Sequence, residues 1–169
     1  MDSIFLRRSV REFVDKEVEC SKLENILRAG MQAPSAWNFQ PWEFLLIENQ
    51  NIKDAISEIS PYAHPIKNCG AAILVMCNLD RVKKDSQWWE QDLSAATQNM
   101  LLQTVEEGLA GVWIGMYPEK ERVENLKKYF KLPDNIIPFS IIAIGYSDKK
   151  NEFIDKFNSE KVYFEEYNN

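Results

Sequence analysis

The sequence predicts one domain that mixes helices and strands. Its 169 residues are enough to bury a sizeable core. Helical and strand-like apolar patterns alternate along the chain, with no internal repeat, low-complexity segment or linker. Such alternation could suggest a doubly wound nucleotide fold. Neither GxGxxG nor GxxxxGK[ST] can be drawn through the six glycines, so a dinucleotide in the usual strand-turn-helix crevice is disfavoured.

The first half of the chain predicts two helices and two strands. Residues 21–32 keep an apolar helical period, which Pro34 ends because its ring opposes continuation. Ser21 and Glu24 have the spacing of a capping box at the start of this helix. The run AAILVMC at residues 71–77 is typical of a strand buried on both faces. The elements expected here are a helix at 21–32, a strand at 43–47, a helix at 52–59 and a strand at 71–77.

The second half opens on the longest predicted helix, residues 86–107. Its apolar side chains lie on most sides, so we expect it at the centre of a core or of a subunit interface. The elements expected next are a strand at 112–115, a helix at 119–130 and a strand at 136–145. Residues 146–169 are charged but carry more aromatics than a disordered tail usually does. We expect this tail to be extended and packed on something, with a second subunit as one option.

Composition argues against several classes of function. A net charge of −6 disfavours a nucleic-acid binder, which needs a basic face. No apolar run approaches the length of a membrane span or a signal peptide, so no membrane association is expected. Cys20, Cys69 and Cys77 fit reduced thiols in a cytoplasmic protein better than a disulfide framework. His64 is the only histidine and no zinc motif is present, so no metal site is expected.

Three arginines fall close together near the N-terminus. If this segment is extended, Arg7, Ser9 and Arg11 point to one side. Two guanidiniums flanking a hydroxyl would make a clamp for a phosphate or a pyrimidine carbonyl, because arginine offers planar, forked donors. Arg8 adds a third positive charge. The alternative is a basic surface patch, which is the favoured interpretation of the segment taken alone.

The stretch APSAWNFQPWEFLLI, residues 33–47, crowds aromatics and prolines into one connection. Its hydroxyl, amide and backbone donors could recognise a planar heteroaromatic ring on a rigid loop. The candidate contacts are Pro34, Ser35, Ala36 and Asn38. The alternative is a core-filling turn in which the tryptophans of this stretch are packing residues.

Two weaker signals follow later in the chain. A strand that ends at Gly115 would let a flat ligand approach the backbone closely, although a plain buried strand end is at least as common. Lys156 and Lys161 in the tail could reach a phosphate. Exposed lysines without a ligand are the ordinary alternative.

Together these segments resemble the nitroreductase family of FMN-dependent oxidoreductases. The matching pieces are RRSVREF, APSAWNFQPWEF, GVWIGMYPEKERVENLKKYFKLP, IIAIGYSDKK and DKFNSEKVYFEEY. They cover nearly the whole chain, and the first two are the specific ones. The resemblance implies one α+β domain over residues 1–169, with a central, mostly antiparallel sheet flanked by helices. It also implies an intertwined homodimer that exchanges its C-terminal extensions and holds two FMN molecules at its interface.

The resemblance also implies the cofactor contacts. From one subunit we expect Arg7, Arg8 and Ser9 at the FMN phosphate and ribityl chain, Arg11 at the pyrimidine edge, Gly115 and Met116 along the ring, and Lys156 and Lys161 at the phosphate. The other subunit should contribute Pro34, Ser35, Ala36 and Asn38 to the same flavin. Trp37 and Trp42 would then be interface and core packing.

The implied reaction is ping-pong. NAD(P)H passes a hydride to FMN and leaves, and a nitroaromatic, quinone or other electron-poor small molecule then takes the electrons. The flavin performs the chemistry, so no catalytic side chain is expected. A cation such as Arg11 beside the pyrimidine edge would raise the reduction potential. The alternatives are a non-catalytic flavin-binding sensor or store and a family relative that acts on another substrate. The choice between NADH and NADPH stays open.

Overall fold

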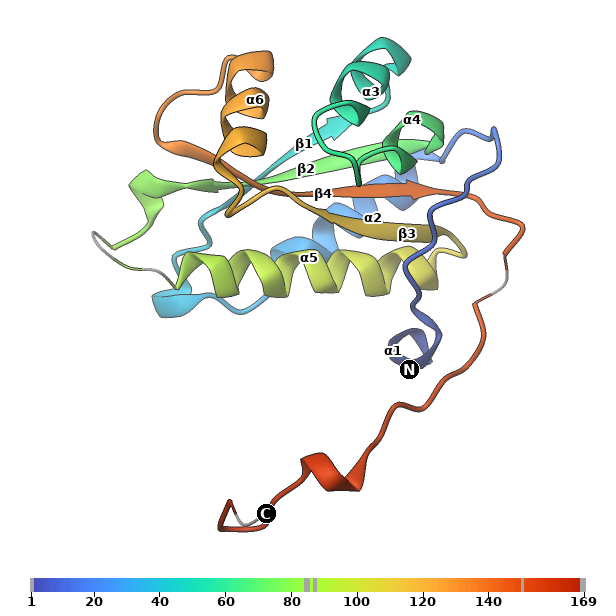
Figure 1. Cartoon of the computed structure of the whole chain (residues 1–169), viewed down its shortest axis with the longest axis vertical. Helices are drawn as coiled ribbons and strands as arrows, with labels where there is room; N and C mark the ends of the chain where they lie inside the picture. Colours follow the sequence, from blue (N-terminus) through green and yellow to red (C-terminus); the bar gives the residue numbers. More distant parts are fainter. Residues whose placement is uncertain (1, 84–85, 87, 150, 168–169) are drawn as a thin grey trace.

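The computed structural model describes residues 2–83, 86, 88–149 and 151–167. Within these residues the centre of the molecule is an antiparallel sheet with helices on both faces (Figure 1). Its strands are β1 (Trp42–Ile47), β2 (Ala71–Asn78), β3 (Ala110–Gly115) and β4 (Ile136–Gly145). They lie in the order β1-β2-β4-β3, and each neighbouring pair is antiparallel. The expected α+β class and the antiparallel sheet are therefore confirmed.

Two layers of helices cover the sheet. On one face lie α2 (Cys20–Met31) and α5 (Trp89–Glu106), and on the other lie α3 (Gln50–Ser57), α4 (Pro65–Asn68) and α6 (Lys120–Phe130) (Figure 1). The short helix α1 (Ser3–Leu6) packs beside α5. Three 3-10 turns complete the regular structure of the described residues, at Ala36–Asn38, Leu79–Arg81 and Ser159–Lys161.

Strand β2 explains why residues 71–77 are apolar throughout. Alternate residues of a strand point to opposite faces of the sheet. Ile73 and Val75 therefore join the core under α2 and α5, whereas Leu74 and Met76 join the core under α3, α4 and α6. The prediction of a strand buried on both faces is confirmed.

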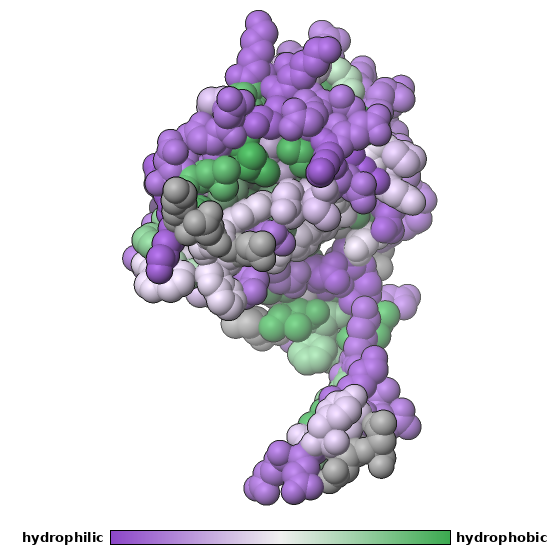
Figure 2. Space-filling view, turned by 60° about the vertical axis from the view of Figure 1, so that its left-hand side comes forward, coloured by the Kyte–Doolittle hydropathy of each residue, from purple (hydrophilic) through white to green (hydrophobic). Residues whose placement is uncertain are grey.

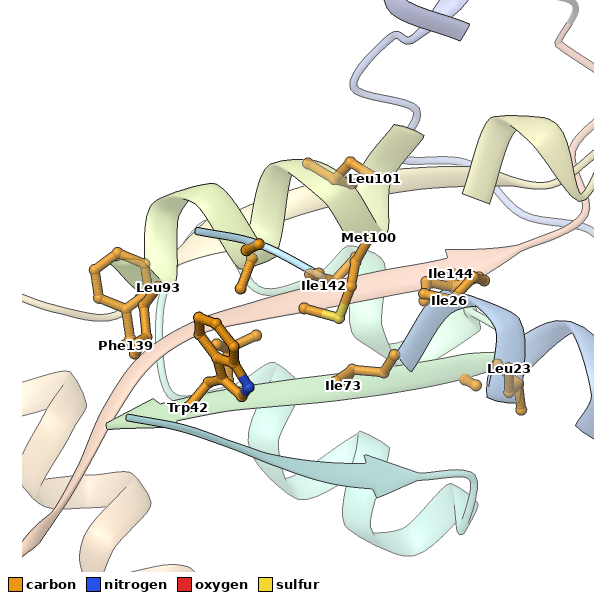
Figure 3. Packing of buried hydrophobic residues seen from close by; sticks show 14 of the residues in the cluster. Leu23, Ile26, Trp42, Ile73, Leu93, Met100, Leu101, Phe139, Ile142 and Ile144 are labelled. Atoms are coloured by element: carbon orange, nitrogen blue, oxygen red, sulfur yellow. The ribbon is translucent and has the colours of Figure 1, made fainter. Parts of the chain in front are cut away.

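The core under α5 brings the long helix close to α2. Leu93 and Met100 of α5 point toward Trp42 and Ile142 of the sheet (Figure 3). A Cβ added to Gly30 of α2 would lie only 2.9 Å from Cγ of Met100, so the close approach of the two helices requires glycine there. The predicted central role of this helix in a core is confirmed.

The capping box predicted at Ser21 is wrong. Helix α2 begins one residue earlier, at Cys20, and its N-cap is Glu19, with no side-chain cap. The Glu19 carbonyl instead accepts the N–H groups of Lys22 and Leu23. Glu24 does not bond to the start of the helix. It pairs instead with Arg28 one turn later, whose Nε donates to Glu24 Oε1 at 3.1 Å. The start of α5, predicted at residue 86, lies at Trp89.

Beyond Tyr146 the described chain forms an extended arm, as predicted. The arm contains one 3-10 turn, Ser159–Lys161, and no strand among its described residues. It touches the body of its own chain near its beginning, where Phe153 stacks on Phe5 at 4.8 Å and Ile154 N–H donates to Phe5 O at 3.2 Å. Further along it projects away from the body, where Phe157 is 75% and Phe164 87% exposed (Figure 2).

Candidate active site

The N-terminal basic segment lies along the outer edge of β3. Ser9 forms an isolated parallel bridge with Gly111, and Val10 N–H donates to Gly111 O at 3.1 Å. Arg11 follows on the exposed side, and its Nη1 donates to Ser9 O at 3.3 Å. The extended backbone expected for this segment is therefore present, and β3 fixes its position.

Arg7, Arg8 and Lys156 line one cavity of about 330 Å³. Arg8 binds main-chain carbonyls: Nη1 donates to Arg7 O at 2.7 Å and Nη2 to Glu152 O at 2.6 Å. Arg8 thus ties the arm to the N-terminal segment and keeps Lys156 nearby. Within the described chain, neither the Arg7 nor the Lys156 side chain has an ion-pair partner, so both remain available for an anion. Lys161 lies farther along the exposed arm and does not line this cavity.

The second predicted half of the site is the loop between α2 and β1. Its backbone enters the left-handed region at Trp37 (φ 51°), Asn38 (φ 57°) and Gln40 (φ 49°). Side chains stabilise this conformation: Gln40 N–H donates to Ser35 Oγ, and Gln40 Nε2 donates to Asn38 Oδ1, both at 3.0 Å. The polar groups of Ser35 and Asn38 are therefore held on a defined loop.

Asp92 anchors this loop to α5, and the sequence patterns did not single it out. It lies in the first turn of α5, is only 7% exposed, and its Oδ1 accepts the Ala36 N–H at 2.9 Å. Burial raises the pKa of Asp92 above its ordinary value, while the hydrogen bond from Ala36 opposes that change. An acidic residue in a first helical turn was the one available signal.

The two tryptophans of this loop region have different environments. Trp42 is 7% exposed and packs in the core, as predicted. Trp37 is 62% exposed in the single chain, and Phe39 beside it is also exposed. The predicted role of Trp37 in a subunit interface stays a prediction.

Gly115 ends β3 at an exposed position. No atom lies within 4 Å of the place where a Cβ would be, so the surface there is open. Met116 differs, because its side chain is fully buried in the core under α6 and its N–H donates to Phe139 O at 3.1 Å. A ligand on this surface could meet Gly115 directly but Met116 only through main-chain atoms.

The largest cavity described, about 920 Å³, lies elsewhere. Residues of the segment 13–18 line it together with Glu48, Lys53 and Lys67. Lys53 is buried and donates to Cys69 O at 2.7 Å, so it already has a partner. None of the predicted cofactor contacts lines this cavity. The size of this cavity alone does not make it the cofactor site.

The two predicted halves contact α5 at different levels. Asp92 holds the Pro34–Asn38 loop at the beginning of the helix, whereas Gln98 of the same helix lines the cavity of Arg7 and Lys156. Asp92 and Gln98 are six residues apart, which corresponds to about 9 Å along the helix axis.

Among the described residues, no helix is at once long and apolar enough to cross a membrane. The same residues contain no group of three or more His, Cys, Asp or Glu that could hold a metal ion.

A helix-flanked antiparallel sheet places the protein in the α+β class. The model of the nitroreductase family matches residues 4–68 and 61–146, so the chain belongs to the nitroreductase family. A protein of Methanothermobacter thermautotrophicus, named "Putative NADH dehydrogenase/NAD(P)H nitroreductase", is 36% identical over 167 residues, covering 99% of this chain and 87% of that protein.

Solved structures agree with this assignment. A structure from Clostridium acetobutylicum, named "Putative NADH Oxidase", has a TM-score of 0.95 and 44% identity, and the match covers 98% of this chain and 100% of that one. A structure from Clostridium difficile R20291, named "FMN-dependent Nitroreductase", has a TM-score of 0.90 and 27% identity, with coverage of 99% and 100%. The fold is therefore shared over nearly the whole chain.

Proposed function

We propose that the protein is an FMN-dependent oxidoreductase that moves electrons from NADH or NADPH to nitroaromatic, quinone or similar electron-poor small molecules. Membership of the nitroreductase family supports an oxidoreductase, and one similar structure is named as FMN-dependent. The observation on this chain that carries the proposal is the convergence of Arg7, Arg8 and Lys156 on one cavity, which α1, α5 and the arm also line.

The residues at this cavity fit a phosphate monoester. Arg7 and Lys156 have no ion-pair partner within the described chain. Asp155 also lines the cavity, but its Oδ1 accepts the Phe157 N–H at 2.9 Å and it does not pair with either cation. Arginine can bind two phosphate oxygens through its fork, and lysine adds a compact charge. Ser9 follows directly and could bind the ribityl hydroxyls. The anionic end of FMN would thus be held in a protein whose net charge is −6.

The open end of β3 would accommodate the ring system of FMN. Gly115 lies about 13 Å along the strand from Gly111, and the open space beside it would admit a flat ring. FMN, when bound, supplies the two-electron chemistry of the reaction. Arg11 would place positive charge beside the pyrimidine edge and favour negative charge there. Ser35 and Asn38 would add donors and acceptors from the second half of the site.

A homodimer would complete the site, and the arm supports it. The aromatic side chains of the arm and Trp37 are exposed in the single chain, and exposed apolar surface of this kind marks interaction sites. We propose that the arm covers a second copy and that each flavin takes Arg7, Ser9 and Arg11 from one copy and the Pro34–Asn38 loop from the other.

The kinetic scheme is part of the same proposal. One open face at Gly115 would serve both donor and acceptor, so NAD(P)H would leave before the acceptor binds. None of the three cysteines is in a disulfide, which favours a reducing, cytoplasmic setting. A flavin-binding sensor or store, or a relative with another substrate, is the competing function.

The test is an anaerobic spectroscopic titration. The purified protein, supplied with FMN, should be yellow and should bleach on addition of NADH or NADPH, and a nitroaromatic or a quinone should restore the colour. A protein that does not take up FMN would contradict every flavin-based function. A yellow protein that neither nicotinamide bleaches would favour the sensor or store.

A further inference from the structure

The guanidinium of Arg122 lies at the open end of β3. Its Nη1 donates to Gly115 O at 3.0 Å, and its Cζ lies 5.6 Å from the centroid of the Tyr62 ring. Arg122 comes from the start of α6 and Tyr62 from the loop between α3 and α4. Arg122 therefore links the Tyr62 loop to Gly115, the glycine proposed to lie beside the flavin ring.

Arg122 has no acidic partner in the part of the chain that the structure describes. Glu121 precedes it directly and Glu124 follows two residues later, yet neither forms an ion pair with it. A guanidinium has five N–H donors, and the bond to Gly115 O uses only one of its nitrogens. Most of its capacity to bind an anion is therefore unused, in a protein with an excess of carboxylates.

Tyr62 supplies an aromatic surface at the same corner. It is 67% exposed, and Arg122 lies near its ring at a cation–π distance. Much of the ring is therefore open to solvent, and Arg122 reaches the main-chain carbonyl of Gly115 from the same side. A cation, an aromatic ring and an empty strand end together would recognise a flat molecule with an anionic group.

We propose that Arg122 and Tyr62 select the acceptor: a planar aromatic nitro compound that carries a carboxylate is preferred over its neutral counterpart. The inference rests on the proposed function, because it places the acceptor beside Gly115. The aromatic ring packs against Tyr62, and the free guanidinium nitrogens of Arg122 bind the carboxylate. A carboxamide of nearly the same shape loses this charge-assisted hydrogen bond.

The test compares 4-nitrobenzoate with 4-nitrobenzamide as acceptors for the FMN-loaded protein. The measured quantity is the ratio of the two kcat/KM values. Because each variant is compared with the wild type, the intrinsic difference in reactivity between the two compounds cancels. Arg122→Gln should lower the ratio about tenfold, the usual order for one charge-assisted contact. Arg122→Lys keeps the charge but not the fork, so its ratio should fall by less.

Two further variants serve as controls. Lys128→Gln removes one exposed positive charge from the far end of the same helix and should leave the ratio within about twofold of the wild type. Tyr62→Leu should lower kcat/KM for both compounds alike, because it removes packing but not charge. If Arg122→Gln does not fold, the Arg122→Lys ratio and its decrease with added salt carry the test.

Each outcome has one meaning. If the wild type reduces both compounds but Arg122→Gln and Arg122→Lys leave the ratio unchanged, Arg122 only holds Gly115 in place and the inference is wrong while the proposed function stands. A wild-type protein that reduces neither compound contradicts the proposed function, and the inference with it.

Discussion

The main-chain N–H of Ala36 donates a 2.9 Å hydrogen bond to Oδ1 of Asp92. This contact joins the loop before β1 to the first turn of α5, across 56 residues of sequence. Asp92 is buried, so the bond is shielded from water, and the positive end of the helix dipole favours a carboxylate at this position. The loop that carries Ser35 and Asn38 therefore depends on a residue that would not itself touch the cofactor.

Replacing Asp92 by alanine should weaken both the fold and FMN binding. The Ala36 N–H would lose its acceptor in a half-buried place, which costs on the order of 1–3 kcal/mol in the free energy of unfolding. We expect the Kd for FMN to rise about tenfold, which corresponds to about 1.4 kcal/mol. Urea unfolding and a flavin fluorescence titration measure the two effects. Asp92→Asn keeps an oxygen acceptor and should change both quantities less. A loss of stability without a change in the Kd for FMN would show that this loop is not part of the FMN site.

Asp92 should also give the wild type a distinctive pH dependence. Burial raises its pKa in the folded state, so between the unfolded and folded pKa values the folded protein binds more protons. The contribution of Asp92 to the free energy of unfolding is then greatest below that range and falls as the pH rises through it. Relative to Asp92→Asn, the wild type should thus be more stable at about pH 4 than at about pH 7. Urea unfolding at both pH values tests this, and a pH-independent difference would contradict it.

Gly115 and Gly145 should respond differently to alanine. A Cβ at Gly115 meets no atom within 4 Å, so Gly115→Ala should leave the melting temperature nearly unchanged. It should nevertheless raise the Kd for FMN several-fold, because the methyl group would occupy the open surface proposed for the ring. A Cβ at Gly145 would lie 3.0 Å from Gly70 N and from Phe13, so Gly145→Ala should lower stability by about 1–3 kcal/mol. Unchanged FMN affinity in Gly115→Ala would place the ring elsewhere.

The three thiols should differ in reactivity. Burial raises the pKa of Cys69 to about 11 and that of Cys77 to about 12, so both stay protonated near neutral pH, whereas Cys20 is exposed. Iodoacetamide at about pH 8 should therefore label the native protein once, at Cys20, and the urea-unfolded protein at all three cysteines. Peptide mass spectrometry locates the label. Rapid labelling of Cys77 in the native state would contradict the packing of β2.

Elements with a clear apolar period could be predicted from the sequence. The apolar run at residues 71–77 predicted both the strand and the burial of its two faces, because a strand between two helical layers has no polar side. The start of α2 could not be predicted, because Glu19, which caps it through its carbonyl, carries no side-chain signal. The helices α1 and α4, four residues each, are too short to show a period.

The contacts that shape the candidate site are mostly non-local. The hydrogen bond between Ala36 and Asp92 and the pairing of Arg122 with Tyr62 join residues that no local spacing connects. The order of the strands decides such neighbours, and the sequence patterns do not report that order. The basic segment at Arg7 gained a functional interpretation only through its resemblance to a family, since taken alone it favours a basic surface patch.

The central claim is that each flavin site takes one half from each of two chains, and a mixed dimer tests it most directly. One chain carries Arg7→Glu with Arg11→Glu, and the other, with a different affinity tag, carries Ser35→Ala with Asn38→Ala. Each homodimer should retain little FMN. In the purified heterodimer, one site combines both damaged halves and the other combines both intact halves, so we predict one FMN per two chains and bleaching of that FMN by NAD(P)H. If both halves of a site came from one chain, every site in the heterodimer would be damaged. A heterodimer that binds no more FMN than either homodimer would contradict the account.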